Sequence, residues 1–149
     1  MWMTSVNESI SNNIEQNGRV VPVDVRICAD GLSSTAQGTV TEQTGCRILT
    51  YREPGMDDSR TELRFAPDSV QMKRTGTYST EMHFAPGQLF LGSYRTPFGQ
   101  IGFRLQTKRL TGRETAKGWV AALRYELHMD GSDPEQHRLE LTITAKSET

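Results

Sequence analysis

A two-residue repeat of apolar side chains, which begins at Val20 and recurs almost to the end of the chain, constrains the fold more than any other feature. It is clearest at 119–129 and at 139–145, where apolar residues occupy alternate positions. Such alternation is typical of strands with one buried face. Turn-forming peptides, most of them roughly ten residues apart, separate the apolar runs, as expected of an antiparallel meander. These peptides are "APDS", "TGTYS", "APGQ", "TPFG", "TGRETAKG" and "DGSDPE".

The pattern predicts ten candidate strands. They span about 20–29, 36–44, 46–53, 61–66, 69–75, 78–84, 88–96, 100–110, 118–129 and 136–146. An open sheet of this length would leave unpaired edges and a wet apolar face, so closure into a barrel is the better solution. We therefore expect an all-β fold, a single antiparallel meander closed into a barrel of eight to ten strands.

The chain divides into a short N-terminal extension and one barrel domain. Residues 1–19 carry a weak helix signal, in which Ser5 caps a turn and Ile10 and Ile14 share a face, so this segment is expected to be partly helical or flexible. Residues 20–149 form the barrel domain. A chain of 149 residues with 35% apolar content is long enough for one core.

Charge and hydropathy argue against several classes of partner. Lys and Arg number 17 against 18 for Asp and Glu, so no overall field attracts a polyanion or an anionic membrane. The first nineteen residues lack the apolar core of a signal peptide, and no later stretch is long enough to span a bilayer. We therefore expect a cytoplasmic protein with no membrane partner, for which nucleic acid is a minority hypothesis.

Neither the cysteines nor the histidines form a catalytic or metal-binding motif. Cys28 and Cys46 are not a C-x-x-C pair and have no His at ligand spacing, which favours reduced thiols over zinc or a redox centre and leaves a disulfide open. His83, His128 and His137 show no triad or H-E-x-x-H spacing. The sequence therefore assigns no catalytic residue, metal or cofactor, and an enzyme is the less favoured class.

The stretch "SYRTPFGQIGF" is interpreted as the corner of a hairpin. Pro97 suits the second position of a tight turn and Gly99 the fourth. The pairs predicted along this hairpin are Thr96 with Gly99, Tyr94 with Ile101, Gly92 with Phe103, and Phe90 with Leu105. Gly92 leaves room for the ring of Phe103 in this register.

Polar side chains converge on one end of the predicted barrel. The register across "APDS" places Arg74 opposite Thr61 on the apolar face, where an arginine without a partner is uncommon. Strand direction brings the ends of other strands to the same barrel end. The candidate ligand-binding residues gathered there are Tyr51, Glu53, Arg74, Tyr94 and Thr96.

Several peptides carry a resemblance to a known family. They are "TYRE", "VQMKRTG", "MHFAPGQ", "YRTPFG", "ALRYELHMDG" and "HRLELTITAK". From about Val23 to Lys146 the chain resembles the YwiB-like family of small bacterial proteins, a domain of unknown function. The resemblance implies a calycin-like (lipocalin-like) barrel and, by analogy with calycins, a small ligand inside it.

Three functions follow as hypotheses. The leading one is a barrel that binds a small, anionic ligand, with Arg74 anchoring an acidic head group and Tyr51 and Tyr94 donating hydrogen bonds. The inner face would contribute Phe65, Met72, Phe90, Phe103, Tyr125 and Leu127. The alternative is a packed barrel plugged by an Arg74–Glu53 pair. A partner-interaction barrel, contacting RNA through the basic hairpin 104–118, is the third.

The turn in "HFAPGQLF" has two possible registers. A two- or four-residue loop leaves Met82, Phe84, Leu89 and Leu91 as an external patch that needs a cover, either the N-terminal extension or a second subunit. A three-residue loop sends Phe84 inward and predicts a monomer. Pro86-Gly87 suits a type II turn, which fits two-residue hairpins poorly and so favours the longer or bulged loop. Monomer and homodimer both stay open.

Overall fold

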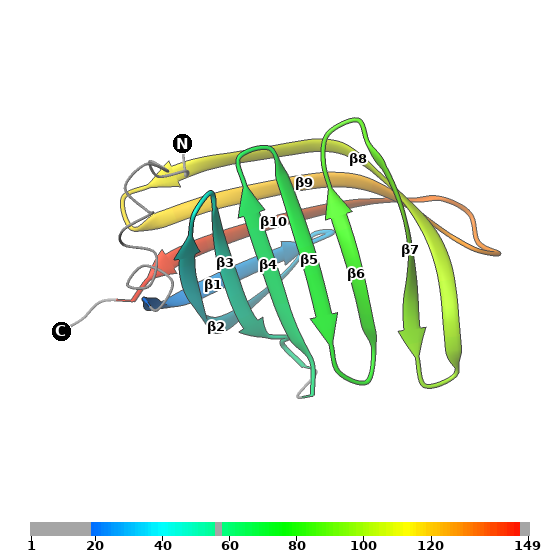
Figure 1. The fold of residues 1–149 in the computed structure, drawn as a ribbon, viewed down its shortest axis with the longest axis horizontal. Coiled ribbons are helices and arrows are strands. Elements are labelled where there is room, and N and C mark those ends of the chain that lie inside the picture. Colours follow the sequence, from blue (N-terminus) through cyan, green and yellow to red (C-terminus); the bar gives the residue numbers. More distant parts are fainter. Residues whose placement is uncertain (1–18, 56–57, 147–149) are drawn as a thin grey trace.

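The computed structural model describes residues 19–55 and 58–146, and in them ten strands follow one another along the chain (Figure 1). The strands are β1 (Val20–Ala29), β2 (Leu32–Gln43), β3 (Cys46–Arg52), β4 (Arg60–Ala66), β5 (Ser69–Thr75), β6 (Ser79–Phe84), β7 (Leu89–Thr96), β8 (Gly99–Thr115), β9 (Gly118–Met129) and β10 (Glu135–Ala145). All ten predicted strands are confirmed, most of them to within two residues at each end.

The strands form one closed antiparallel barrel. Each pairs with its neighbour in sequence, and β1 pairs with β10 as well as with β2, which closes the ring. Closure removes the free edges that an open meander would expose. The predicted all-β barrel is confirmed, with ten strands.

Alternate residues of the strands fill the barrel interior. The most deeply buried side chains come from strands all around the ring and are at most 2% exposed: Phe65, Phe84, Leu49, Leu63, Leu105, Leu123, Leu141, Ile143, Val25 and Val70. Aromatic rings contact one another edge to face, as in the Phe65–Trp119 and Phe84–Tyr125 pairs. These buried side chains and rings form the hydrophobic core of the barrel.

Two strands are longer than the alternation predicted. β2 begins at Leu32, directly after a tight turn in which Asp30 has a φ of 52° and Gly31 a φ of 88°. β8 continues to Thr115, so the turn expected over "TGRETAKG" is reduced to Ala116 and Lys117. Both extensions are mostly polar and exposed, and for that reason they show no apolar repeat.

The hairpin around Pro97 has the predicted register. All four predicted pairs, from Thr96 with Gly99 to Phe90 with Leu105, are present. A β-carbon at Gly92 would lie 2.9 Å from the ring of Phe103, so a glycine is needed where the ring packs. "TPFG" is the corner of a hairpin, and the ring of Phe98 is 93% exposed at its tip.

β6 and β7 separate soon after they meet. Only Ser79 with Arg95 and Thr80 with Tyr94 are paired, although both strands continue beyond these residues. At the far end, the loop 85–88 is tied to β8 instead, since the amide of Gly87 donates to the carbonyl oxygen of Thr107 at 3.2 Å. A register shift follows in β8 between Thr107 and Arg109. β6 and β7 are therefore the most weakly paired neighbours in the described barrel.

The external apolar patch considered for this hairpin does not form. Met82 is 6% exposed and Phe84 is 1% exposed, because both point into the barrel, and Phe90 packs partly against the core. Only Leu89 and Leu91 of the four face outward, at 56% and 67% exposed. The inward position of Phe84 is confirmed and the register that needs a cover is wrong, but the loop that accompanies it, 85–88, has four residues and not the predicted three.

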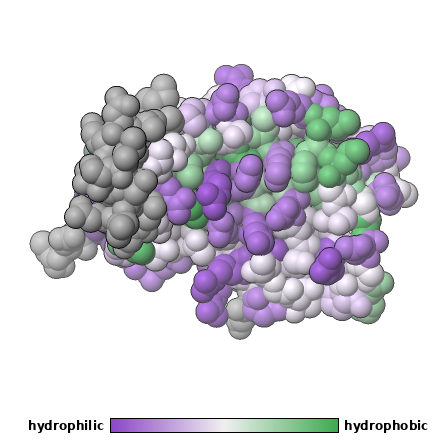
Figure 2. Space-filling model, viewed as in Figure 1, coloured by the Kyte–Doolittle hydropathy of each residue, from purple (hydrophilic) through white to green (hydrophobic). Residues whose placement is uncertain are grey.

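Hydrophilic residues dominate the face shown in Figure 2, on which hydrophobic residues gather mainly in the upper part. In the part of the chain that the structure describes, no helix is long and apolar enough to cross a membrane. The expectation for the extension 1–19, including Ile10 and Ile14, lies outside the described residues except at Arg19. Cys28 and Cys46 are free thiols, so the disulfide left open is not formed.

We expect Gly38→Ala to destabilise the barrel next to Tyr51. Gly38 lies opposite Tyr51, and an added β-carbon would lie 2.4 Å from the carbonyl oxygen of Thr50 and 3.0 Å from the β-carbon of Tyr51. Because backbone must move, the free energy of unfolding should fall by about 1–3 kcal/mol in urea titrations. Thr39→Ala, at the exposed neighbour, is the control and should cost less than about 1 kcal/mol. Equal losses in the two variants would contradict the close approach of β2 and β3.

Candidate functional site

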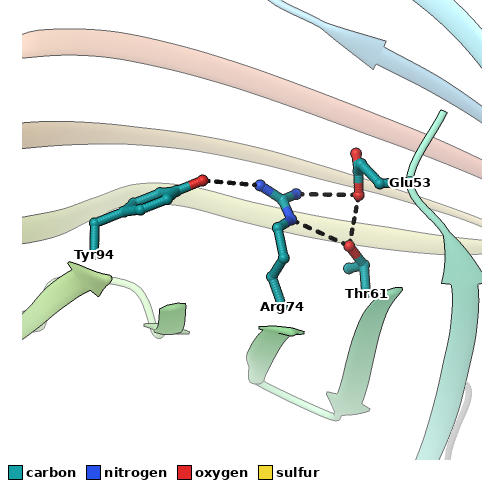
Figure 3. A network of polar contacts seen from close by, with 4 residues as sticks. All are labelled: Glu53, Thr61, Arg74 and Tyr94. Atoms are coloured by element: carbon teal, nitrogen blue, oxygen red, sulfur yellow. Dashed lines mark hydrogen bonds and ion pairs between the residues drawn. The ribbon is translucent and has the colours of Figure 1, made fainter. Parts of the chain in front are cut away.

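A cluster of polar side chains lies inside the barrel between β3, β4, β5 and β7. Arg74 on β5 stands opposite Thr61 on β4, as predicted from the register across "APDS". Glu53 follows the end of β3 and Tyr94 lies on β7, so four different segments contribute (Figure 3). The turns at this barrel end are 76–78 and 97–98, whereas 67–68 and 85–88 lie at the other end (Figure 1).

Arg74 links the other members of the cluster. Its Nη2 donates to Oε1 of Glu53 at 3.2 Å and its Nε donates to Oγ1 of Thr61, also at 3.2 Å. Thr61 in turn donates to the same Glu53 oxygen at 2.5 Å. The guanidinium and the carboxylate are thus held in one geometry by a third group, which lowers the cost of burying the charges.

The ion pair is only partly exposed to solvent. The side chain of Arg74 is 20% exposed and that of Glu53 is 17% exposed. Burial works against the charged form of Arg74, but Glu53, followed by Tyr94, outweighs it, and the pKa of the guanidinium is raised. Arg74 is therefore a permanent positive charge that is largely shielded from solvent.

The two tyrosines occupy different environments around this charge. Tyr51 is 5% exposed, and burial, followed by the Glu53 carboxylate, raises the pKa of its phenol. Tyr94 is half-buried, and its hydroxyl accepts a long hydrogen bond of 3.5 Å from Nη1 of Arg74. Nη1 has the weakest of the three contacts of the guanidinium, and it points away from Glu53 toward β7 (Figure 3).

The fifth predicted residue, Thr96, is engaged elsewhere. Its hydroxyl accepts a hydrogen bond from the amide of Phe98 at 3.0 Å and donates to the carbonyl oxygen of Gly99 at 2.9 Å. Thr96 therefore stabilises the hairpin turn, and the structure does not bring it into the cluster around Arg74. In its place the cluster contains Thr61, which is fully buried. The predicted Thr61–Arg74 pairing was the signal that could have identified it.

A window opens in the barrel wall where β6 and β7 separate. A cavity of about 440 Å³ lies there, lined by residues of both strands and of β5. Lys73, Arg95 and other outward-facing residues line it, together with Arg74, Thr80 and Phe90, which alternate with them along the strands. Arg74, whose side chain is 20% exposed, is thus among the residues at this opening.

Both ends of the window are closed by contacts between the strands. At one end the hydroxyl of Thr80 donates to the carbonyl oxygen of Ser93 at 2.8 Å, next to the two β6–β7 pairs. Toward the other end the rings of His83 and Phe90 stack, with centroids 4.5 Å apart. Because the opening between β6 and β7 is bounded at both ends, it suits a small molecule better than an inserted peptide strand.

Positive charge predominates at the window. Lys73, Arg74 and Arg95 line the cavity, and Glu81 is the carboxylate that lines it with them. Glu53 neutralises part of this charge from inside. An oxyanion entering here would meet Lys73 and Arg95 at the rim, with Arg74 among the other lining residues.

The opposite end of the barrel holds a second charged group that the sequence analysis missed. Arg47 lies over the ring of Trp119, 4.6 Å from its centroid, and pairs with Glu42 and with Glu114, each at 3.2 Å. These residues line a cavity of about 560 Å³ together with apolar side chains such as Val23, Val40 and Ile143. Little in the sequence indicates that Glu114 contacts Arg47, because Glu114 belongs to the stretch that was expected to be a turn.

Within residues 19–55 and 58–146, no group of three or more His, Cys, Asp or Glu side chains could hold a metal ion. His128 and His137 have partners of other kinds. His128 contacts Arg104 at 2.9 Å, and His137 contacts Asp30 at 2.8 Å.

Comparison with known proteins identifies a family and a fold. A family model described as a domain of unknown function (DUF1934) matches residues 25–141. Among solved structures, the crystal structure of the ywiB protein from Bacillus subtilis matches with a TM-score of 0.76 and 15% sequence identity, covering 90% of this chain and 98% of that one. At this identity the structural match speaks for the fold alone. No curated protein sequence matches.

We expect Glu53→Gln to cost more stability than Arg74→Met. The glutamine leaves a largely buried guanidinium without its counter-charge, which should lower the free energy of unfolding by about 1–3 kcal/mol. Arg74→Met removes the charge and keeps the packing of the stem, so it should cost less, and Arg74→Ala should be worse than Arg74→Met. Chemical denaturation of the single and double variants measures these differences.

The control for this comparison is a pair on the outside of the barrel. Arg64 and Glu62 are 3.6 Å apart, and their side chains are 43% and 40% exposed. Glu62→Gln should change the free energy of unfolding by less than about 1 kcal/mol. If Glu53→Gln has no larger effect than Glu62→Gln, the buried pair is not a structural element.

Alkaline pH should destabilise the barrel through its buried phenols. Burial, followed by Asp30, raises the pKa of Tyr125 from 10.0 to about 12. The resulting stabilisation is complete below pH 10 and is lost as the pH rises through 12, because the unfolded chain releases the proton first. Unfolding measured between these pH values should therefore show a decline to which Tyr125 contributes about 2–3 kcal/mol, and Tyr125→Phe should remove that part and leave the part that comes from buried Tyr51. An unchanged decline in this variant would rule out the phenol as its source.

Proposed function

The chain belongs to the family described as a domain of unknown function (DUF1934), and we propose that its barrel binds a small anionic ligand through the window between β6 and β7. The likeness to the YwiB-like family seen in the sequence is confirmed. The proposal concerns the ligand, for which neither the family description nor the structural match names a candidate.

The observation that carries the proposal is the position of Arg74. Its Nε and Nη2 are held by Thr61 and Glu53 at 3.2 Å, while Nη1 has only the 3.5 Å contact with Tyr94. An oxyanion that lies beside Nη1 and the Tyr94 hydroxyl, within reach of both, would receive one charge-assisted and one neutral hydrogen bond. The fixed guanidinium loses little conformational freedom on binding, which favours affinity.

The window also suggests the size and shape of the ligand. A cavity of about 440 Å³ is within the range that proteins use for small molecules. Phe90, which lines the cavity and stacks on His83, offers an apolar ring face beside the cations. We therefore propose a small organic carboxylate or phosphate ester with an apolar, planar body.

A packed barrel without a ligand is the second candidate. It is favoured by the partners that Arg74 already has, because an ion pair with two supporting hydrogen bonds needs no further ligand. The two candidates differ in what Arg74→Met does: it removes ligand binding in the first, and in the second it changes only stability.

Native mass spectrometry of the purified protein, beside denaturing mass spectrometry of its extract, tests for a ligand that travels with the barrel. Benzoate and phenyl phosphate are suitable probes for binding measured by calorimetry and by the shift of the melting temperature. We expect a probe to raise the melting temperature of the wild-type protein and to have no such effect on Arg74→Met. Arg95→Gln at the rim should weaken binding more at low than at high salt.

Arg26→Gln on the outer face of β1 is the matched control, because it removes the same charge away from the window. If no molecule accompanies the protein and neither probe shifts the melting temperature, the packed barrel is the better description. If Arg26→Gln weakens binding as much as Arg74→Met, the probe responds to overall charge and the window is not the site.

A further inference from the structure

We propose that the outer face of β8, β9 and β10 carries a second binding site, whose ligand is an oligophosphate. The site is a row of arginines that stand directly opposite one another on neighbouring strands. Arg109 on β8 pairs with Arg124 on β9, and Arg124 pairs with Arg138 on β10. All three side chains are exposed. The window between β6 and β7 is a separate cavity with no lining residue in common.

Such a row is unfavourable for the barrel itself. Side chains opposite one another on adjacent strands are close, and like charges at these positions repel. Among the described residues, none of the three guanidinium groups lies within 4.0 Å of a carboxylate oxygen, although four contacts of this kind involve other arginines. Asp30 attracts Arg138 from beyond this distance, but no direct ion pair in the described part of the barrel offsets the repulsion, so an external anion is a natural partner.

Two acidic residues beside the row, Asp30 and Glu126, contact other groups. Asp30 accepts a hydrogen bond from the backbone amide of Arg138 at 2.8 Å, and its other oxygen lies 2.8 Å from Nδ1 of His137. Glu126 lies 3.7 Å from Nζ of Lys108. These contacts leave the fork-shaped guanidinium ends available for a ligand.

The surface is hollowed where the arginines meet. A cavity of about 870 Å³ is lined by cations from all three strands and by the turn after β1: Asp30, Gly31, Lys108, Arg109, Arg124, Gln136, His137 and Arg138. Lys108 joins the row because the register shift between Thr107 and Arg109 gives β8 an extra residue at this point. The concave site holds three arginines that form no ion pair with a described residue, Lys108 paired with Glu126, and one carboxylate, Asp30, so that cations can surround an anion from several sides.

The length of the row points to a chain of phosphate groups. Adjacent strands are about 4.8 Å apart, so the three arginines extend over about 10 Å, which exceeds the size of one phosphate. Arginine binds phosphate oxygens through two parallel donors, and a row of such forks suits consecutive phosphates. None of the described lining residues is Phe, Tyr or Trp, which disfavours single-stranded RNA because its bases stack on aromatic rings.

Calorimetric titration with inorganic tripolyphosphate tests the proposal on the full chain. We expect binding that weakens as the salt concentration rises from about 50 to 200 mM. Arg124→Gln, at the centre of the row, should weaken binding by about tenfold. It should also reduce the slope of the logarithm of the affinity against the logarithm of the salt concentration by about one. Without ligand, the same variant should melt at a higher temperature than the wild type, because it removes two repulsive contacts.

Arg26→Gln is again the matched control and should leave tripolyphosphate binding and the melting temperature nearly unchanged. Arg74→Met should also leave this binding intact, which separates the outcome from that of the window. Equal binding of tripolyphosphate and nucleoside triphosphates would support recognition of the phosphates alone. No binding at low salt, or equal losses in Arg124→Gln and Arg26→Gln, would overturn the proposal. Tighter binding of a single-stranded oligonucleotide would overturn the oligophosphate class in favour of RNA.

Discussion

The pairing of β1 with β10 is the contact on which the rest of the structure depends. It joins the two ends of the meander and converts ten strands into a ring, in which an inner face exists for every strand. Without closure, the face that carries Val25, Leu141 and Ile143 would be exposed to water. Closure also places the ends of β3, β5 and β7 around one interior, which is why a carboxylate, a guanidinium and a phenol can meet there.

The barrel is uneven, and its two unusual features lie in different parts of the wall. β6 and β7 share two residue pairs, whereas β1 and β2 share ten. The weak seam coincides with the loop 85–88 bound to β8, and it leaves Arg74 within reach of solvent. The long β8 allows the second feature, because its register shift brings a lysine and an arginine together beside the arginines of β9 and β10. Closure of the barrel and irregular strand pairing together decide which arginines a ligand from the solvent can reach.

Much of the fold and part of the candidate site could be predicted from the sequence. Apolar alternation located all ten strands, and turn chemistry at Pro97 and Gly99 predicted a register that places Gly92 opposite Phe103. The same reasoning placed Arg74 opposite Thr61 and near Glu53. These predictions succeeded because period, turn type and strand direction are local properties, and an antiparallel meander converts them into neighbours in space. The predicted strands were too short at the start of β2 and at the end of β8, because the exposed polar residues there show no apolar alternation.

What the sequence by itself determined is therefore the all-β meander, its closure and the inward position of Arg74. The tertiary structure alone decided which groups contact that guanidinium. Thr61 lies in the cluster, whereas the hydroxyl of Thr96 is hydrogen-bonded within the hairpin turn. It also decided that β6 and β7 part, and that Arg109, Arg124 and Arg138 stand in one row. The physical reason is that strand separation and a register shift depend on how distant segments pack, and neither leaves a mark in the period of a single strand.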